Sequence, residues 1–380
     1  MKFQAWGPAA LAVGFIRRRS QTVNRKVTCS VVGARGYSGL ETARLLLQHP
    51  VADLTHCYAT SQFDLTKHLS SPKAGAVKCL LDSEILKTVA ETAKRNVEKG
   101  LPPEVVFLAT PAEVSMKLAP ELVQLGVKVI DLSGAFRLKK NDYQTWYGFE
   151  HTADASLKSA KYGLAPFAGP ASEAETLVAN PGCYATAIAL ALIPVVKAGL
   201  VDEKSIVIDA KSGATGAGKK ASEAHLYSEV AGECLPYKVG KHQHYPEIVE
   251  TVELFAGKTI DAHMTTSLLP TRRGIIAGVY ANLVNGMTAA DVEKAFAQAY
   301  EHYPLVSFGS AVQNSHLLQL KKVVGTGRTH ISFVVEGQKL YLFSCLDNLL
   351  KGAASQAVEN FNRLNDLPLQ TGIENLEALS

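Results

Sequence analysis

A short β-rich run that passes directly into a glycine-rich turn constrains the fold of this chain more than any other feature. Residues 27–32 read Val-Thr-Cys-Ser-Val-Val, and residues 33–39 follow at once as Gly-Ala-Arg-Gly-Tyr-Ser-Gly. The apolar pattern over 40–49 predicts a helix, which Pro50 ends. A strand that turns through glycines into a helix directs backbone N–H groups and the helix dipole at an anion. This arrangement predicts a site for the pyrophosphate of a dinucleotide.

The three glycines are spaced G-x-x-G-x-x-G instead of the usual G-x-G-x-x-G, but their place between a strand and a helix is the context that the motif requires. A second predicted strand, 53–60, has no acidic residue at its tip to bind ribose hydroxyls; Ser61 and nearby hydroxyls are suited to a 2′-phosphate. We therefore predict NADP as the cofactor. The cofactor contacts expected in this region come from Gly33, Arg35, Gly36, Tyr37, Ser38, Gly39 and Ser61.

Strands alternate with helices up to Gly182, and the pattern then changes. Predicted strands at 105–110 and 127–132 flank a helix at 112–125, which indicates a parallel, doubly wound sheet of the Rossmann type. A long apolar helix at 183–198 follows, with Pro194 bending it or marking its last turn. A helix is also predicted at 348–364. Five further strands indicate a mixed sheet in a second, α+β domain, at 205–210, 261–269, 278–282, 329–335 and 339–344. The fold class is thus α/β, divided near residue 182.

Length and composition agree with two folded domains and exclude several classes of protein. A chain of 380 residues, 47% hydrophobic, is too long for one ordinary core. The net charge of +4 is small, and no basic block resembles a nucleic-acid-binding arm. Six widely spaced cysteines without a CxxC pair suit a reducing compartment and argue against a disulfide framework.

The first 26 residues differ from the rest, since they are basic and no acidic residue precedes Glu41. The apolar stretch 5–16 is too short to span a bilayer, and its arginine cluster follows it, unlike the charge of a secretory signal. The segment is either an organellar transit peptide or a disordered extension. We favour the extension, because serine is scarce, and expect a cytoplasmic protein without membrane contact.

Cys183 is the candidate nucleophile. It follows Asn180-Pro181-Gly182 at the predicted start of the long apolar helix. A helix N-terminus lowers the pKa of a thiol, and its free N–H groups stabilise an oxyanion. A thiolate is both a strong nucleophile and a good leaving group, as a thioester intermediate requires. The other five cysteines are interpreted as structural.

Two histidines two residues apart, His242 and His244, share one face if their segment is a strand, which is one pattern of metal ligation. No third ligand with suitable spacing is nearby, so we predict no metal. A histidine that acts as general acid and base for Cys183 is the favoured interpretation, and a solvated polar loop is the alternative.

Residues 211–220, Lys-Ser-Gly-Ala-Thr-Gly-Ala-Gly-Lys-Lys, lack the order of a nucleotide-triphosphate loop, because a second lysine stands where serine or threonine belongs. We interpret the segment as a cationic loop that contacts substrate or cofactor. Arginine binds carboxylate or phosphate bidentately, and Arg137 and the adjacent pair Arg272 and Arg273 could each do so. The candidate substrate-binding residues are Arg137, Lys211, Ser212 and Arg272, and Gly213 is a candidate cofactor contact.

With these pieces assembled, the chain resembles the N-acetyl-γ-glutamyl-phosphate reductase family of arginine biosynthesis. The resemblance runs from about residue 26 to residue 361, through GARGYSG, FLATP, DLSGAFR, YGL, NPGCYATA, KSGATGAGKKAS, HQHYPEI, LLPTRRGI and DNLLKGAA. It implies a Rossmann domain over 27–182 that the C-terminal helix 348–380 completes, and a catalytic, dimerising domain over 183–347. It also implies NADP(H), a homodimer or homotetramer, and Asn348 near the nicotinamide.

The implied reaction begins when the Cys183 thiolate attacks an acyl phosphate and phosphate leaves. NADPH then reduces the thioester, and N-acetyl-glutamate 5-semialdehyde is released with histidine help. Reduction of a carrier-linked aminoadipyl phosphate in lysine biosynthesis is not excluded by the motifs. Aspartate-semialdehyde dehydrogenase fits HQHYPEI and DNLLKGAA poorly. A non-catalytic NADP-binding sensor is opposed by the intact cysteine and histidines.

Overall fold

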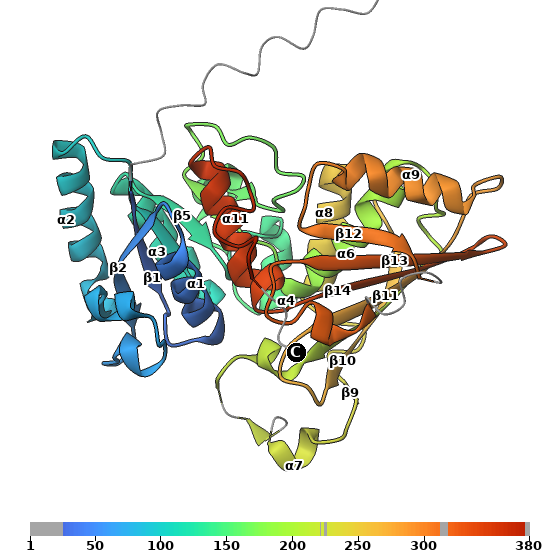
Figure 1. Ribbon diagram of the computed structural model, residues 1–380, viewed down its shortest axis with the longest axis horizontal. Helices are drawn as coiled ribbons and strands as arrows, with labels where there is room; N and C mark the ends of the chain where they lie inside the picture. The colour runs from blue at the N-terminus through green and yellow to red at the C-terminus, as the bar shows by residue number, and fades with distance from the viewer. Residues whose placement is uncertain (1–25, 221, 224–225, 312–317, 377–380) are drawn as a thin grey trace, which may run out of the picture.

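The computed structural model describes residues 26–220, 222–223, 226–311 and 318–376. The predicted N-terminal extension, residues 1–26, lies outside the described residues except for Lys26. Figure 1 shows two parts side by side, each built around one sheet, with α11 between them. In the described residues no helix is long and apolar enough to cross a membrane.

The first sheet has seven parallel strands in the order β3-β2-β1-β4-β5-β7-β6, which confirms the predicted doubly wound α/β class. The inner strand β1 is buried along its whole length, as expected for a parallel strand covered on both faces. The strands are β1 Val27–Val32, β2 Ala52–Ala59, β3 Lys78–Leu81, β4 Val105–Leu108, β5 Lys128–Asp131, β6 Lys161–Tyr162 and β7 Leu177–Ala179.

Helices cover both faces of this sheet. Helix α1 (Tyr37–Gln48) lies with α11 (Ser355–Leu364) on one face, whereas α2 (Ile85–Glu98) and α3 (Ala112–Gln124) pack together on the other. Helix α1 begins at Tyr37, three residues before the predicted start, so the last residues of the glycine turn already belong to the helix. The sequence interpretation missed α2 and the strands β3, β6 and β7. Short helices α4 (Tyr143–Tyr147) and α5 (Asp154–Ser159) follow β5.

The second sheet is mixed, as predicted, with the order β12-β13-β14-β11-β8-β10-β9. Strand β8 pairs in parallel with β10 and antiparallel with β11. Strands β8 and β11 each run three residues beyond the predicted limits at one end. The strands are β8 Ile206–Gly213, β9 Leu235–Pro236, β10 Ala262–Leu269, β11 Ile275–Asn282, β12 Val306–Ser310, β13 Thr329–Glu336 and β14 Lys339–Leu346.

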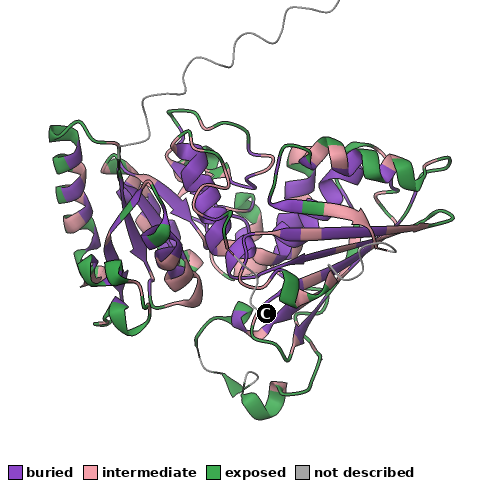
Figure 2. Ribbon diagram, in the orientation of Figure 1, coloured by how far each residue is buried: buried purple, intermediate pink, exposed green. Residues whose placement is uncertain are grey.

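Helix α6 (Cys183–Lys197) is the core of this second part. Every residue from Tyr184 to Val196 is buried, which explains why the helix is apolar on all sides. Pro194 lies in its last turn, one of the two positions expected. Helices α8 (His244–Ala256) and α9 (Ala289–Tyr300) pack against α6. Figure 2 shows α6 and the strands largely buried and the short α7 (Tyr227–Val230) exposed.

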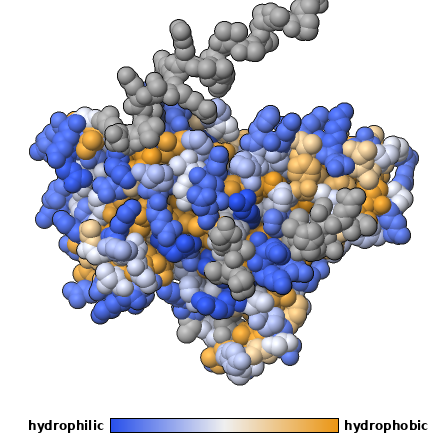
Figure 3. Space-filling view, viewed as in Figure 1, coloured by the Kyte–Doolittle hydropathy of each residue, from blue (hydrophilic) through white to orange (hydrophobic). Residues whose placement is uncertain are grey.

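The opposite face of the second sheet, which we call the open face, carries aromatic side chains. Tyr280 pairs across the strands with Val207 and with Tyr341, so these side chains share one face. The rings of Tyr280 and Phe343 lie 6.1 Å apart between centroids. Val207 is 41% exposed. Further apolar surface lies at the tip of the molecule near α7, where Leu226 is 52% exposed (Figure 3).

The predicted helix at 348–364 is divided. Residues Leu350–Ala354 form one turn of π-helix, which we call the π-turn, and α11 follows directly. Helix α11 then packs on α1 and β5 of the first part.

Candidate active site

The glycine turn (residues 33–39) brings backbone segments closer together than any side chain allows. A Cβ at Gly33 would lie 2.4 Å from the carbonyl oxygen of Ala109, and Gly33 has φ of +77°. A Cβ at Gly39 would lie 2.3 Å from the carbonyl oxygen of Gly33. Helix α1 starts at Tyr37 with Gly36 as N-cap and no side-chain capping bond, so its first N–H groups face outward for an anion. The turn therefore fits the pyrophosphate of a dinucleotide.

Arg35 and Ser61 meet beside this turn. Both side chains are exposed, and the Arg35 guanidinium donates a hydrogen bond to the Ser61 hydroxyl. Ser61 follows β2, so the pair lies at the end of the second strand, where the ribose of a bound dinucleotide is held in this fold. A cation and a hydroxyl at that point fit a 2′-phosphate, whereas no acidic side chain occupies positions 60–62.

Cys183 is the first residue of α6, as predicted. Its N-cap is Gly182, and no side chain caps the helix, so backbone N–H groups are free beside the sulfur. Cys183 is half-buried, and the pKa of its thiol is raised to about 11 because burial of the sulfur outweighs the lowering by Arg137 and by the Tyr184 N–H. The predicted net lowering of this pKa is therefore wrong. The helix N-terminus and a cation act in the expected direction, but burial is the larger effect.

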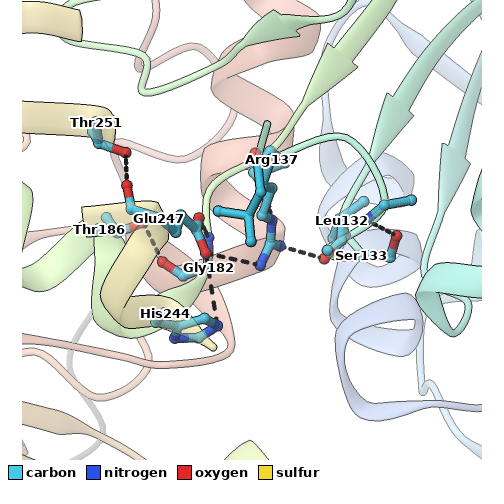
Figure 4. A network of polar contacts seen from close by, with 12 residues as sticks. Leu132, Ser133, Arg137, Gly182, Thr186, His244, Glu247 and Thr251 are labelled. Atoms are coloured by element: carbon cyan, nitrogen blue, oxygen red, sulfur yellow. Dashed lines mark hydrogen bonds and ion pairs between the residues drawn. The ribbon is translucent and has the colours of Figure 1, made fainter. Parts of the chain in front are cut away.

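Three charged or titratable side chains converge on Gly182, next to Cys183 (Figure 4). A Cβ at Gly182 would lie 2.5 Å from His244 Nε2, 2.8 Å from Arg137 Nη1 and 2.9 Å from Glu247 Oε2. A Cβ at this position therefore requires these side chains to move. The turn before the nucleophile is thereby in direct contact with His244, which the sequence named as a candidate acid and base.

The two histidines do not lie on a strand. Helix α8 begins at His244, and His242 precedes it, where its Nδ1 accepts a hydrogen bond from the His244 N–H at 3.1 Å. Burial lowers the pKa of His242 to about 2 and that of His244 to about 3. Both rings are therefore neutral at pH 7. The Nδ1 atom of His244 is buried without a hydrogen-bond partner among the described residues.

Glu247 is fully buried one turn after His244, and the sequence interpretation missed it. Its carboxylate accepts hydrogen bonds from the Gly182 N–H at 2.7 Å and from the Tyr162 hydroxyl at 2.9 Å. It also lies 3.6 Å from Arg137 Nη1 and 3.9 Å from His244 Nε2. The signal for Glu247 was present as His-Tyr-Pro-Glu, since residues three apart on a helix share a face.

Arg137 reaches the site, but its guanidinium bonds are made within the protein. Its Nε donates to the Asn180 carbonyl at 2.8 Å and its Nη2 to the Leu132 carbonyl at 2.7 Å. With Glu247 on the third nitrogen, the side chain joins the end of β5 to the turn before Cys183. Arg137 thus places positive charge near the thiol; direct contact with substrate stays a prediction.

The π-turn forms the wall behind the nucleophile. A Cβ at Gly352 would lie 2.7 Å from the Cys183 Cβ, so the backbone of the π-turn is packed directly on Cys183. The Asn180 side chain donates to the Ala353 carbonyl at 3.1 Å and fixes the same two segments together. Gly352 and Asn180 were not among the predicted site residues, because only the fold brings these distant segments together.

Asn348 holds two loops of the second part together. Its side-chain oxygen accepts from the Gly274 N–H at 2.8 Å, and its amide donates to the Thr215 hydroxyl at 3.0 Å. Gly213 packs on the turn after β10, where its Cβ would lie 2.7 Å from the Arg273 nitrogen. The predicted contacts of Asn348 and Gly213 with the cofactor stay predictions.

The remaining candidates divide between the two faces of β8. Ser212 is buried on the face that packs against the helices. Lys211 points to the open face, since side chains alternate along a strand, and it pairs there with Asp209. The structure therefore does not bring Lys211 to Cys183 within one chain. The Arg272 side chain is exposed, while its carbonyl accepts from the Thr215 N–H at 3.0 Å.

Metal ligation finds no support at this site. Among the described residues no group of three or more histidine, cysteine or acidic side chains is arranged to hold a metal ion. All six cysteines are free thiols.

Comparisons with known proteins identify both parts of the chain. Residues 28–175 match the family described as semialdehyde dehydrogenase, NAD binding domain. Residues 183–348 match the family described as semialdehyde dehydrogenase, dimerisation domain.

Curated relatives align over nearly the whole chain. An N-acetyl-gamma-glutamyl-phosphate reductase of Streptococcus thermophilus is 39% identical and covers 88% of this chain and 94% of its own. The protein of that name from Geobacillus thermodenitrificans is also 39% identical, covering 92% and 97%. That from Halalkalibacterium halodurans is 36% identical, covering 90% and 97%.

Solved structures share the fold at much lower identity. Aspartate semialdehyde dehydrogenase II of Vibrio cholerae, in complex with ASA, superposes with a TM-score of 0.63 at 16% identity, covering 90% of this chain and 98% of that one. A probable aspartate-semialdehyde dehydrogenase of Pseudomonas aeruginosa gives a TM-score of 0.59 at 16% identity, covering 88% and 97%.

Proposed function

The chain belongs to the N-acetyl-γ-glutamyl-phosphate reductase family of semialdehyde dehydrogenases, and on that premise we propose how its residues carry out the reaction. It is an oxidoreductase of arginine biosynthesis that uses a nicotinamide cofactor. The reaction reduces N-acetyl-L-glutamyl 5-phosphate to N-acetyl-L-glutamate 5-semialdehyde and releases phosphate. The observation that supports the roles below is the convergence of His244, Arg137 and Glu247 on Gly182, beside Cys183.

The first step forms a thioester on Cys183. Neutral His244 accepts the thiol proton as the sulfur attacks the acyl carbon, because the raised pKa of Cys183 requires a base at pH 7. The bond from that carbon to the phosphate oxygen then breaks and phosphate leaves. The free N–H groups at the start of α6 stabilise the oxyanion of the tetrahedral intermediate.

When bound, the cofactor supplies the hydride that reduces the thioester carbon. His244 passes the thiol proton to the departing phosphate, and it later relays a proton from solvent to the departing sulfur, so Cys183 and His244 end the cycle as they began. His242 is the less suitable of the two histidines for this proton transfer, since its Nδ1 already accepts the N–H of His244. Glu247 and Arg137 position His244 and Gly182.

NADP(H) is the proposed cofactor. Its pyrophosphate binds at the glycine turn and the start of α1, and its 2′-phosphate binds Arg35 and Ser61. Contacts from Tyr37, Ser38, Gly213 and Asn348 complete this part of the proposal. The substrate's carboxylate and phosphate are bound by cations near the site, with Arg272 and Ser212 as the candidates.

The enzyme works as a homodimer or homotetramer, in which two subunits pair through the open face of the second sheet. The face exposes Val207 and carries the half-buried rings of Tyr280, Tyr341 and Phe343, and it belongs to the part that matches a dimerisation domain. The division of the chain into 27–182 with 348–380, and 183–347, is part of the same proposal. So is a cytoplasmic location, which the six free thiols support.

The decisive experiment follows the reverse reaction. We expect purified protein to reduce NADP⁺ when given phosphate and N-acetyl-glutamate semialdehyde, with little activity on aspartate semialdehyde or with NAD⁺. The variant C183A should lose turnover and keep NADP⁺ binding, while C234A, which removes an exposed thiol, should behave as the unaltered enzyme. Turnover that survives in C183A contradicts the thioester. If the protein binds NADP⁺ but shows no turnover, the carrier-linked aminoadipyl substrate or a non-catalytic sensor is favoured.

A further inference from the structure

A buried group of Lys351, Glu359 and Tyr303 includes one residue of the π-turn, Lys351, which is next to Gly352. Lys351 Nζ lies 2.7 Å from Glu359 Oε1, and both side chains are 0% exposed. The Tyr303 hydroxyl donates to the other oxygen of Glu359 and contacts Lys351, whose ammonium lies 4.9 Å from the centre of the tyrosine ring. The group joins the π-turn to α11 and to the segment between α9 and β12.

Lys351 belongs to the π-turn itself. Hydrogen bonds run from Gly352 N–H to the Asp347 carbonyl and from Ala354 N–H to the Leu349 carbonyl, each 2.9 Å long and each spanning five residues. Such a wide turn is rare and occurs mostly as a single turn within an α-helix, frequently at a functional site. Contacts of its side chains must stabilise the π-turn, because an ordinary α-helical turn here would rotate Gly352 away from Cys183.

Burying the charged groups of Lys351 and Glu359 costs free energy of desolvation. Burial lowers the pKa of Lys351 and raises that of Glu359, and the contact between the two side chains opposes both shifts. Apolar side chains of similar size often match or exceed the stability of a buried ion pair. Stability of the fold alone therefore does not account for this group.

We propose that Lys351, held by Glu359 and Tyr303, is a positioning residue that keeps the π-turn in register so that Gly352 stays packed against Cys183. The inference rests on the proposed role of Cys183 as nucleophile. Lys351 is too deeply buried to touch substrate, and it acts through the backbone of its neighbour. Loss of this register uncovers the thiol and displaces it from the attacking position.

The test replaces the whole group with apolar side chains of similar size, in the triple variant K351M, E359M and Y303F. We expect a melting temperature close to that of the unaltered protein, because no buried charge is left unpaired. We expect kcat of the reverse reaction to fall at least about tenfold with KM changed less than about threefold. Alkylation of Cys183 by iodoacetamide should become faster at pH 8, with its pH midpoint lowered, since burial raises the pKa of this thiol.

A matched control removes another buried ion pair of α11, with R363M and E175M. Arg363 and Glu175 form a buried pair near the end of the helix away from the π-turn. This control should leave the pH midpoint of alkylation unchanged and kcat within about threefold of that of the unaltered protein. A triple variant with unaltered kcat and midpoint overturns the proposal, as does a control that shifts both equally.

If the triple variant does not fold, Y303F alone decides the matter. It keeps the ion pair but removes the phenol hydroxyl, and the same lowering of the alkylation midpoint is expected on a smaller scale; an unchanged midpoint refutes the proposal. Alkylation needs neither substrate nor cofactor. Failure of this inference is thus distinguishable from failure of the proposed function, which the reverse reaction of the unaltered protein tests.

Discussion

Replacing Gly182 with alanine tests the geometry of the site with one methyl group. The backbone angles at this position, φ −71° and ψ 156°, suit alanine as well as glycine, so the substitution introduces no backbone strain. Its Cβ nevertheless lies 2.5 Å from His244 Nε2, 2.8 Å from Arg137 Nη1 and 2.9 Å from Glu247 Oε2. To reach ordinary contact at 3.4 Å, the imidazole must withdraw by about 0.9 Å.

The size of the effect follows from that displacement. A shift of about 1 Å in a catalytic group costs roughly a hundredfold in rate, which corresponds to about 2.7 kcal/mol in the activation free energy. Overpacking of a close-packed region should also lower the free energy of unfolding by about 1–3 kcal/mol. We therefore expect G182A to fold, to bind NADP⁺ normally and to lose about 99% of its kcat.

The assay compares kcat of the reverse reaction, NADP⁺ affinity and chemical denaturation for G182A and for G75A. At Gly75 the nearest atom to a new Cβ is 4.0 Å away, so the same substitution makes only an ordinary van der Waals contact there. If G182A keeps kcat within about threefold of the unaltered enzyme, His244 is not the group whose position limits the reaction. An equal loss in G75A would show that the effect does not arise from the clash.

Three further outcomes are expected. R35A should weaken binding of NADP⁺ by about tenfold and that of NAD⁺ little, as measured by calorimetric titration, because the lost contact is with the 2′-phosphate; equal weakening contradicts that role. Iodoacetamide should alkylate Cys183 of the unaltered protein about ten times faster for each pH unit between pH 7 and about 10, since the pKa of the thiol is raised to about 11; a plateau below pH 8 contradicts this. Burial raises the pKa of Glu104 to about 7 although Ser30 donates to it. Stability should therefore fall as the pH rises from the ordinary pKa of 4.5 to 7 and stay low above it, and E104Q should raise the free energy of unfolding at pH 8 by up to roughly 3 kcal/mol while flattening the pH dependence.

The parallel sheet was predictable because its central strands are continuous apolar runs bounded by turn residues. Strand β4 is of this kind, β1 is a β-rich run that leads directly into the glycine turn, and the long helix α6 is largely apolar. Helix α2 was missed, since its buried positions are only four and include Thr92 and Asn96, so its apolar stripe is narrow. The two-residue strands β6 and β9 leave no periodic signal at all.

The site was predictable where its chemistry is local in sequence. Cys183 after a glycine turn carries its own signal, because the helix start and the thiol are adjacent. The opposite holds for Gly352, whose contact with Cys183 joins residues far apart along the chain. The pKa of Cys183 also could not be predicted, since the sequence indicates the helix end that lowers it but not the burial that raises it further.

The packing of α11 on the first sheet has a consequence for how the protein is made. Phe361 lies against Phe107 of β4, and the Asn362 side chain is hydrogen-bonded to His49 just after α1. A ribosome therefore delivers the nucleotide-binding strands long before the helix that covers one of their faces. Until residue 361 emerges, α1 alone covers that face on the nascent chain, and the apolar surface left exposed favours aggregation of a truncated chain.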